Sequence, residues 1–188
     1  MPQKSSTFLD ELVNAARGCF ALLTGNRQAP AFFDFSQRGL VSSLIAVLLG
    51  VALAGFGPLL IGAPVAPGSD TQSIIINLVL FVAQAATAWI ALRQMGRLDG
   101  YVPYLVASNW VTLASAILMV LSALLGPLGI ILLVLVVILA ITSFINVGRF
   151  VVTLAPLQIG ILFLSQAVGV LLALAIVAML MGAPAVGA

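Results

Sequence analysis

The chain has 188 residues, of which 63% are hydrophobic and 6% are charged, and it carries a formal net charge of +2. Its mean hydropathy of +1.28 lies far outside the range of soluble globular proteins. The sequence has no histidine and one cysteine, which excludes histidine-based nucleophiles, bis-histidine haem sites and thiolate metal clusters. We therefore expect no enzyme activity, no cofactor and no metal site. We also expect no nucleic-acid partner.

The first element in chain order is an amphipathic helix predicted over 7–23. Thr7 is suited to cap its start together with Asp10, and Gly25 is suited to follow its end. We expect the helix to lie on the membrane surface, where it contacts lipid or docks a cytoplasmic partner, with Arg17 as one contact. The alternative is a helix that merely packs on the rest of the protein. Its apolar residues recur at helical spacing and are Phe8, Leu9, Leu12, Val13, Ala16, Phe20 and Leu23.

The segment 26–38 connects this helix to the first long apolar stretch. It carries three phenylalanines, which predict anchoring at the headgroup boundary of the membrane. Asp34 is placed to pair with Arg38 if the next helix begins early. The three phenylalanines are Phe32, Phe33 and Phe35.

Five later stretches are each long enough for a helix to cross a bilayer, which takes about 20 mostly apolar residues. The alternation of polar and apolar residues expected of a membrane barrel is absent. Because a backbone in lipid must satisfy its own hydrogen bonds, the predicted fold class is all-α: a polytopic membrane protein with five transmembrane helices in one bundle plus the N-terminal amphipathic interfacial helix. The five predicted spans are 40–61, 73–92, 105–125, 128–147 and 157–181.

The basic residues predict the orientation of the protein. They precede the first span, follow the second or follow the fourth, so five crossings place all of them on one side: Lys4, Arg17, Arg27, Arg38, Arg93, Arg97 and Arg149. By the positive-inside rule the N-terminus is cytoplasmic and the C-terminus is outside. The alanine-rich, short-looped chain suggests a bacterial inner membrane, and no cleavable signal is predicted. We therefore expect a cytoplasmic segment 1–38, a transmembrane domain 39–182 and a short outer tail 183–188. The lone Cys19 is expected to be a packed, reduced thiol, with lipidation or redox chemistry as the alternatives.

Small residues recur every four positions on three of the spans. This spacing lets helix backbones approach closely in lipid. We expect packing seams inside the bundle, with a homodimer interface as the alternative. The residues are Ser42, Ala46, Gly50 and Ala54 on the first span, Ala83, Thr87 and Ala91 on the second, and Ser165, Gly169 and Ala173 on the fifth.

Uncharged polar residues also occur inside the spans. Because no Asp, Glu, Lys or Arg lies deep in any span, we expect these groups to form interhelical hydrogen bonds and not a transport path. The alternative is a small transporter or channel component with a polar path between the second, third and fourth spans. The residues are Asn77 and Gln84, then Ser108, Asn109, Thr112, Ser115 and Ser122, then Thr142 and Asn146, and finally Gln158 and Gln166.

Two surfaces are candidates for contact with other molecules. The unbroken apolar run 130–139 suits contact with lipid or with another membrane subunit. Around the loop that follows the second span, aromatic residues bracket basic ones in the pattern of an aromatic belt. The candidate lipid or partner contacts are Trp89, Arg93, Arg97, Trp110 and Arg149, together with Arg17 and the three phenylalanines.

Two short motifs lie on the predicted cytoplasmic side. One is the turn Asp99-Gly100-Tyr101 with Pro103, and the other runs from Gly148-Arg149 to Leu154-Ala155-Pro156-Leu157-Gln158. With the surface helix and five spans, they resemble the Yip family of membrane proteins and its bacterial relatives. The resemblance implies a non-enzymatic protein associated with membrane organisation or with other membrane components.

We therefore expect a scaffold, an accessory subunit or a membrane-organising factor. Its expected partners are membrane lipids and either another membrane protein or a second copy of the chain. What distinguishes this expectation from the transporter alternative is whether the second, third and fourth spans enclose a continuous polar cavity.

Overall fold

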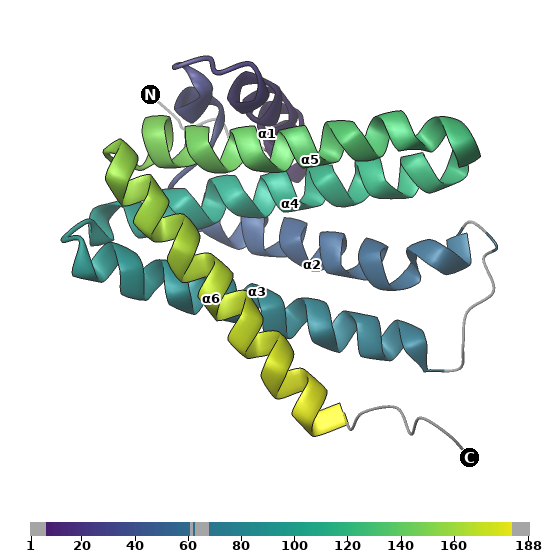
Figure 1. The fold of residues 1–188 in the computed structure, drawn as a ribbon. Coiled ribbons are helices and arrows are strands. Elements are labelled where there is room, and N and C mark those ends of the chain that lie inside the picture. The colour runs from purple at the N-terminus through teal and green to yellow at the C-terminus, as the bar shows by residue number, and fades with distance from the viewer. Residues whose placement is uncertain (1–6, 61, 63–67, 182–188) are drawn as a thin grey trace.

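The structure is a computed structural model that describes residues 7–60, 62 and 68–181. Within these ranges every regular element is helical (Figure 1). The α-helices are α1 (Phe8–Leu23), α2 (Gln37–Leu60), α3 (Ser69–Gln94), α4 (Tyr101–Leu124), α5 (Gly129–Asn146) and α6 (Pro156–Met181). The 3-10 turns are η1 (Ala29–Phe32), η2 (Leu98–Gly100) and η3 (Gly126–Leu128), and a π-helical turn, η4 (Val147–Val151), continues α5. Lys4 and the predicted outer tail lie outside the described residues.

Helices α2 to α6 are long and apolar enough to cross a membrane. This confirms the all-α fold with five spans and identifies an integral membrane protein. Four of the spans begin earlier than predicted, and the first turns of α2 and α3 include the polar residues Gln37 and Ser69. Polar residues are tolerated there because helix ends lie at the level of the lipid headgroups.

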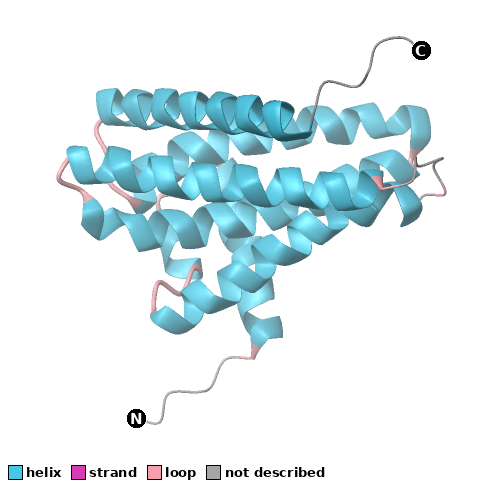
Figure 2. Ribbon diagram, turned by 90° about the horizontal axis from the view of Figure 1, so that it is seen from below, coloured by secondary structure: helices cyan, strands magenta, loops and turns pink. Residues whose placement is uncertain are grey.

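The spans form an open row. α4 packs on both α2 and α5, α2 also packs on α3, and α3 packs on α6. The order across the row is therefore α5, α4, α2, α3, and α6 packs on α3. In Figure 1 α6 crosses the row obliquely, and Figure 2 shows α6 and α1 on opposite sides of the row.

All three predicted stripes of small residues include a residue at a contact between helices. A Cβ atom added to Gly50 would lie 3.5 Å from the Cα of Leu113, so the backbones of α2 and α4 are close. A Cβ added to Gly169 would lie 2.4 Å from the Cγ2 of Thr87, so α6 approaches α3 through this glycine. Both contacts confirm the predicted use of small residues as packing seams.

The predicted caps hold both ends of α1. Thr7 Oγ1 accepts a hydrogen bond from the Asp10 N–H at 3.3 Å, and the Asp10 carboxylate accepts one from the Thr7 N–H at 2.9 Å. At the other end, Gly25 has a φ of 69°, and the Asn26 N–H donates to the Ala21 carbonyl at 2.8 Å. This is a Schellman motif, which needs a residue with positive φ after the helix.

α1 is apolar on two sides. One side, which includes Ala15 and Leu22, is buried against the spans, mainly α4 and α5. The other side leaves Leu9, Val13 and Phe20 more than half exposed. The helix therefore packs on the bundle and also keeps the apolar stripe that an interfacial helix places in lipid.

Candidate functional site

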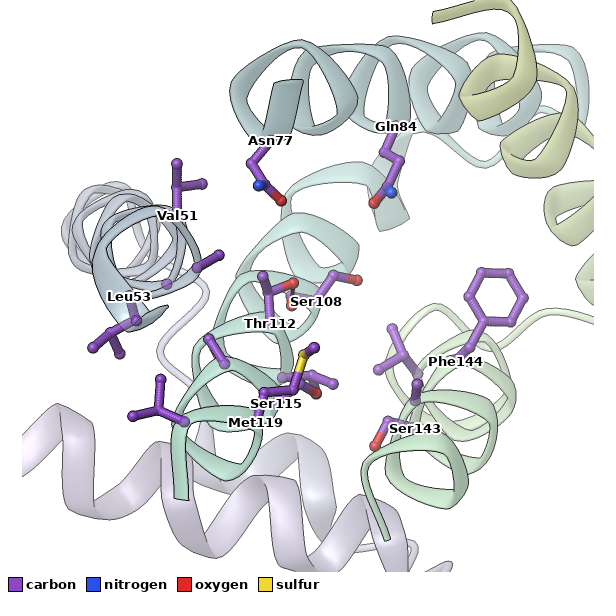
Figure 3. Close-up of a pocket in the computed structure, with 18 of the residues that line it drawn as sticks. Val51, Leu53, Asn77, Gln84, Ser108, Thr112, Ser115, Met119, Ser143 and Phe144 are labelled. Carbon is purple, nitrogen blue, oxygen red and sulfur yellow. Dashed lines mark hydrogen bonds between the residues drawn. The ribbon is translucent and has the colours of Figure 1, made fainter. Parts of the chain in front are cut away.

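A cleft of about 550 Å³ lies within the membrane-spanning part of the protein, between α2, α3, α4 and α5 (Figure 3). α4 supplies Ser108, Thr112 and Ser115 to its lining, and α3 supplies Asn77 and Gln84. These five side chains come from the spans predicted to enclose a polar path. The structure brings them together at one cleft.

α5 contributes a different polar residue from those that the sequence indicated. The Thr142 hydroxyl donates to the Ile138 carbonyl of its own helix at 2.6 Å, and the Asn146 side chain donates to the Leu22 carbonyl of α1 at 2.7 Å. The cleft is lined instead by Ser143, which is 1% exposed. The Ser143 Oγ atom is fully buried and has no hydrogen-bond partner among the described residues.

The rest of the lining is mostly apolar, and it includes no Asp, Glu, Lys or Arg. Four apolar residues form the end of the cleft that lies away from the arginines. The polar groups therefore do not extend along its whole length. The four residues are Gly57, Pro58, Val120 and Ala123.

The cleft is not fully enclosed by the four helices that line it. α3 packs mainly on α2 and α6, whereas α5 packs mainly on α4 and α1, so these two walls stand apart. α5 and α6 meet through an edge-on contact between Phe144 and Phe163, whose ring centres are 5.7 Å apart. No described residue of α6 lines the cleft. α6 therefore lies beside the cleft and contacts both of these walls, through Gln166 on α3 and Phe163 on α5.

Asn77, Thr112 and Ser122 donate to carbonyls of their own helices. Asn109 and Gln166 make interhelical hydrogen bonds of the kind that the sequence predicted. The Asn109 side chain of α4 donates to the Ser43 hydroxyl of α2 at 3.1 Å. The Gln166 side chain of α6 donates to the Gln84 carbonyl of α3 at 2.8 Å. Such bonds contribute about 0.6 kcal/mol each in membrane proteins.

At the end of the bundle that carries the arginines, Arg97 joins the turn before α4 to the turn before α6. Its guanidinium donates to the Thr153 carbonyl at 2.9 Å, to the Thr153 hydroxyl at 2.7 Å and to the Val152 carbonyl. It also lies 3.4 Å from the Asp99 carboxylate. A Cβ added to Gly100 would lie 2.2 Å from Val152 Cγ1. The turn Asp99-Gly100-Tyr101 and the segment 148–158 are thus in direct contact.

The remaining arginines among the candidate contacts lie at the surface. Arg17 is exposed on α1. Arg93 lies over the ring of Trp89 at 5.0 Å, and Arg149 lies over the ring of Phe150 at 5.3 Å. These positions leave the three guanidinium groups accessible to a headgroup or a partner.

The aromatic candidates require a correction. Phe33 is 7% exposed and Trp110 is 5% exposed, and the ring of Trp110 packs 6.0 Å from that of Phe8 in α1. Both belong to the protein core because α1 and the turn after it cover this part of the bundle. Phe32 and Phe35 are partly buried against the same core. The prediction that Phe33 and Trp110 contact lipid or a partner at the surface is therefore wrong.

The ion pair expected of Arg38 also differs. Arg38 pairs with Glu11 of α1 at 3.3 Å, while Asp34 accepts a hydrogen bond from the Ser36 N–H at 2.9 Å. The sequence did not indicate this pair because Glu11 comes close to Arg38 only once α1 has folded back on the bundle.

Comparison with protein-family models, with curated proteins and with solved structures gives no match.

Proposed function

We propose that the protein is a non-enzymatic membrane-organising factor that holds an amphipathic molecule of the bilayer in its cleft. The observation that carries this proposal is a mostly apolar cleft at membrane depth whose lining includes no charged residue. Small-molecule sites in proteins are usually apolar hollows of several hundred cubic ångströms with a few polar groups. The apolar lining favours a ligand that comes from the bilayer.

The scaffold or accessory-subunit role belongs to the same proposal. Besides the sides that pack on α4 and α1, α5 has an exposed apolar face, which is available to lipid, to another membrane protein or to a second copy of the chain. That face includes Ile131, Val134, Val137 and Ile141. The two motifs that resemble the Yip family, at 99–103 and 148–158, support a role in membrane organisation.

We also propose that the end of the bundle with the arginines is cytoplasmic, in a bacterial inner membrane. α2 begins, α3 ends, α4 begins and α5 ends at this side, and it carries Arg38, Arg93, Arg97 and Arg149. The positive-inside rule favours this orientation.

The proposal is tested by filling the cleft. Thr112 points into it, so Thr112→Phe should remove the lipid that co-purifies with the protein in mild detergent, measured by native mass spectrometry. Ile117→Phe is the matched control, because Ile117 is 41% exposed on the same helix and does not line the cleft. Equal lipid retention by the wild type and both variants would contradict the proposal.

A transporter or channel component is the second candidate, favoured by the five polar side chains that α3 and α4 bring to the cleft. The triple variant Ser108→Ala, Thr112→Ala, Ser115→Ala removes three of them and should still assemble, because hydrogen bonds of this kind are worth about 1–2 kcal/mol in total. We expect no solute flux through wild-type protein in liposomes. An ion or solute flux that the triple variant abolishes would replace our proposal with the transporter.

A further inference from the structure

Two exposed arginines flank the contact between the end of α1 and the end of α5. A Cβ atom added to Gly25 would lie 4.0 Å from the Asn146 Nδ2 atom, which donates to the Leu22 carbonyl at 2.7 Å. Arg27 follows Gly25 by two residues, and Arg149 follows Asn146 by three. η1, which starts two residues after Arg27, packs on η4, which contains Arg149. The two arginine side chains therefore start from neighbouring turns.

Neither Arg27 nor Arg149 forms an ion pair within the part of the chain that the structure describes. The ion pairs there use Arg38 and Arg97 instead. Both Arg27 and Arg149 are exposed. A guanidinium group forms two parallel, charge-assisted hydrogen bonds with the oxygens of a phosphate group. Two guanidinium groups on neighbouring turns therefore suit one phosphate.

This pair of arginines lies at the depth of the lipid headgroups. Arg149 follows the last residue of α5 by three positions. α1 is tied to the same end of the bundle, because its Glu11 pairs with Arg38, the second residue of α2. The ends of membrane-spanning helices lie near the headgroups, where the phosphate groups of the bilayer are. A phospholipid is therefore the nearest source of phosphate for the pair.

An exposed apolar surface continues from the pair toward the middle of the membrane. Ile141 and Ile145 precede Arg149 by about two turns and one turn, so the three residues share a face of α5. The two isoleucines are 57% and 45% exposed. Phe20, in the last turn of α1, is 66% exposed. The acyl chains of a phospholipid can cover these residues while its headgroup meets the arginines, which a phosphate ion from solution cannot do.

We propose that Arg27 and Arg149 together bind the phosphate of an anionic phospholipid, and that this lipid holds α1 against the spans. The lipid joins the turn after α1 to the turn after α5, so it binds only while α1 is docked. A ligand that binds one state of a protein shifts the equilibrium toward that state. Neither arginine lines the cleft, so this site is separate from the one in the proposed function.

The first test measures the bound lipid. The full chain is placed in nanodiscs of phosphatidylcholine and phosphatidylglycerol in equal amounts, and native mass spectrometry after extraction in mild detergent measures the phosphatidylglycerol retained per protein. The double variant Arg27→Gln, Arg149→Gln should lower this amount by about tenfold or more, because each arginine adds about fivefold to the attraction of an anionic lipid.

The matched control is the double variant Arg17→Gln, Arg93→Gln. It removes the same charge from two exposed arginines, and these lie on helices with different main neighbours. The phosphatidylglycerol retained by this control should fall by about twofold or less. Equal losses in the two double variants would overturn the inference, since they would show a general attraction of lipid by positive charge.

The second test measures the docking of α1. Cys19 lies on the buried side of α1 and is 5% exposed, so its rate of alkylation by neutral iodoacetamide reports undocking. In the wild type we expect a rate about fivefold lower with phosphatidylglycerol present than in phosphatidylcholine alone. The variant that lacks Arg27 and Arg149 should react at the same rate in both.

Inorganic phosphate distinguishes a lipid from a phosphate ion. Added to wild-type protein in phosphatidylcholine nanodiscs, it should leave the alkylation rate of Cys19 unchanged. A lower rate would show that the arginine pair binds the ion without a lipid, and would overturn the choice of ligand. A wild-type rate that phosphatidylglycerol does not change would overturn the role of the lipid in holding α1.

Discussion

Thr153 adopts a backbone conformation that costs free energy for a β-branched residue, with a φ of 57°. The guanidinium of Arg97 occupies both its carbonyl and its hydroxyl, and thereby offsets part of that cost. A single side chain thus fixes the turn from which α6 begins. The sequence indicated Arg97 as a surface contact, and nothing in its local pattern revealed a partner more than fifty positions away.

We expect Arg97→Lys to destabilise the protein by about 2 kcal/mol, because a lysine cannot reproduce several hydrogen bonds in one plane. Unfolding in a denaturing detergent measures the change. Arg93→Lys is the control, because Arg93 lies at the surface over the exposed ring of Trp89. Equal losses in the two variants would contradict the role assigned to Arg97.

Cys19 allows α1 docking to be followed chemically. Burial raises the pKa of its thiol from 9.0 to about 12, so at pH 8 we expect alkylation about a thousandfold slower than in the denatured chain. Because the folded state favours the protonated thiol, its contribution to stability is complete below pH 9 and is lost as the pH rises from 9 to 12. Arg17→Cys in a Cys19→Ala background, an exposed position on the same helix, should react rapidly.

Single polar positions were only partly predictable. Five of the side chains that line the cleft follow from their spacing on α3 and α4. Ser143 was missed and its neighbour Thr142 was chosen, because a helix that is apolar on nearly every face gives no sign of which side turns inward. The rotation of α5 is set by its packing on α4 and α1, which no local pattern records.

At the scale of elements, α1 buries one of its two apolar sides against the spans and leaves the other side exposed. Its capping box and its C-terminal glycine are visible in the sequence and are confirmed. Its buried side is not visible, because the alanine, glycine and cysteine that dock on the bundle look like weak members of an amphipathic pattern. The π-helical turn after α5 was missed for a similar reason, since it depends on contacts with α4 and not on local residues.

Gly18 is the residue that lets α1 dock closely. A Cβ there would lie 2.6 Å from the ring of Phe33, so Gly18→Leu should cost about 1–3 kcal/mol of docking free energy. The alkylation rate of Cys19 should then rise about ten- to a hundredfold. Ala16→Leu, on the exposed side of the same helix, should leave the rate unchanged. A low rate in Gly18→Leu would show that α1 docks by another contact.

At the scale of the whole molecule, the lengths of the spans were predictable because the bilayer sets them. Their order across the row was not, because lipid gives helices no hydrophobic preference for one neighbour over another. The small residues indicated some of the helix surfaces that meet, since Gly50 and Gly169 lie at two of the close contacts between helices. The cleft itself could not be predicted, because it depends on α3 and α5 standing apart.

The orientation of the molecule gives a direct prediction. A reporter fused after Ala188 should report the outside, and one fused after Gly96 of a shortened chain should report the cytoplasm, because the arginines are retained inside. Paired enzymatic reporters active on opposite sides of the membrane measure this. Reversed activities would contradict the proposed orientation.

The packing of α6 has a consequence for biogenesis. Because α6 packs mainly on α3, the four helices that line the cleft make their mutual contacts without it. Helices leave the ribosome in chain order, so all four walls of the cleft are synthesised before α6. The insertion of α6 then covers the small residues of α3.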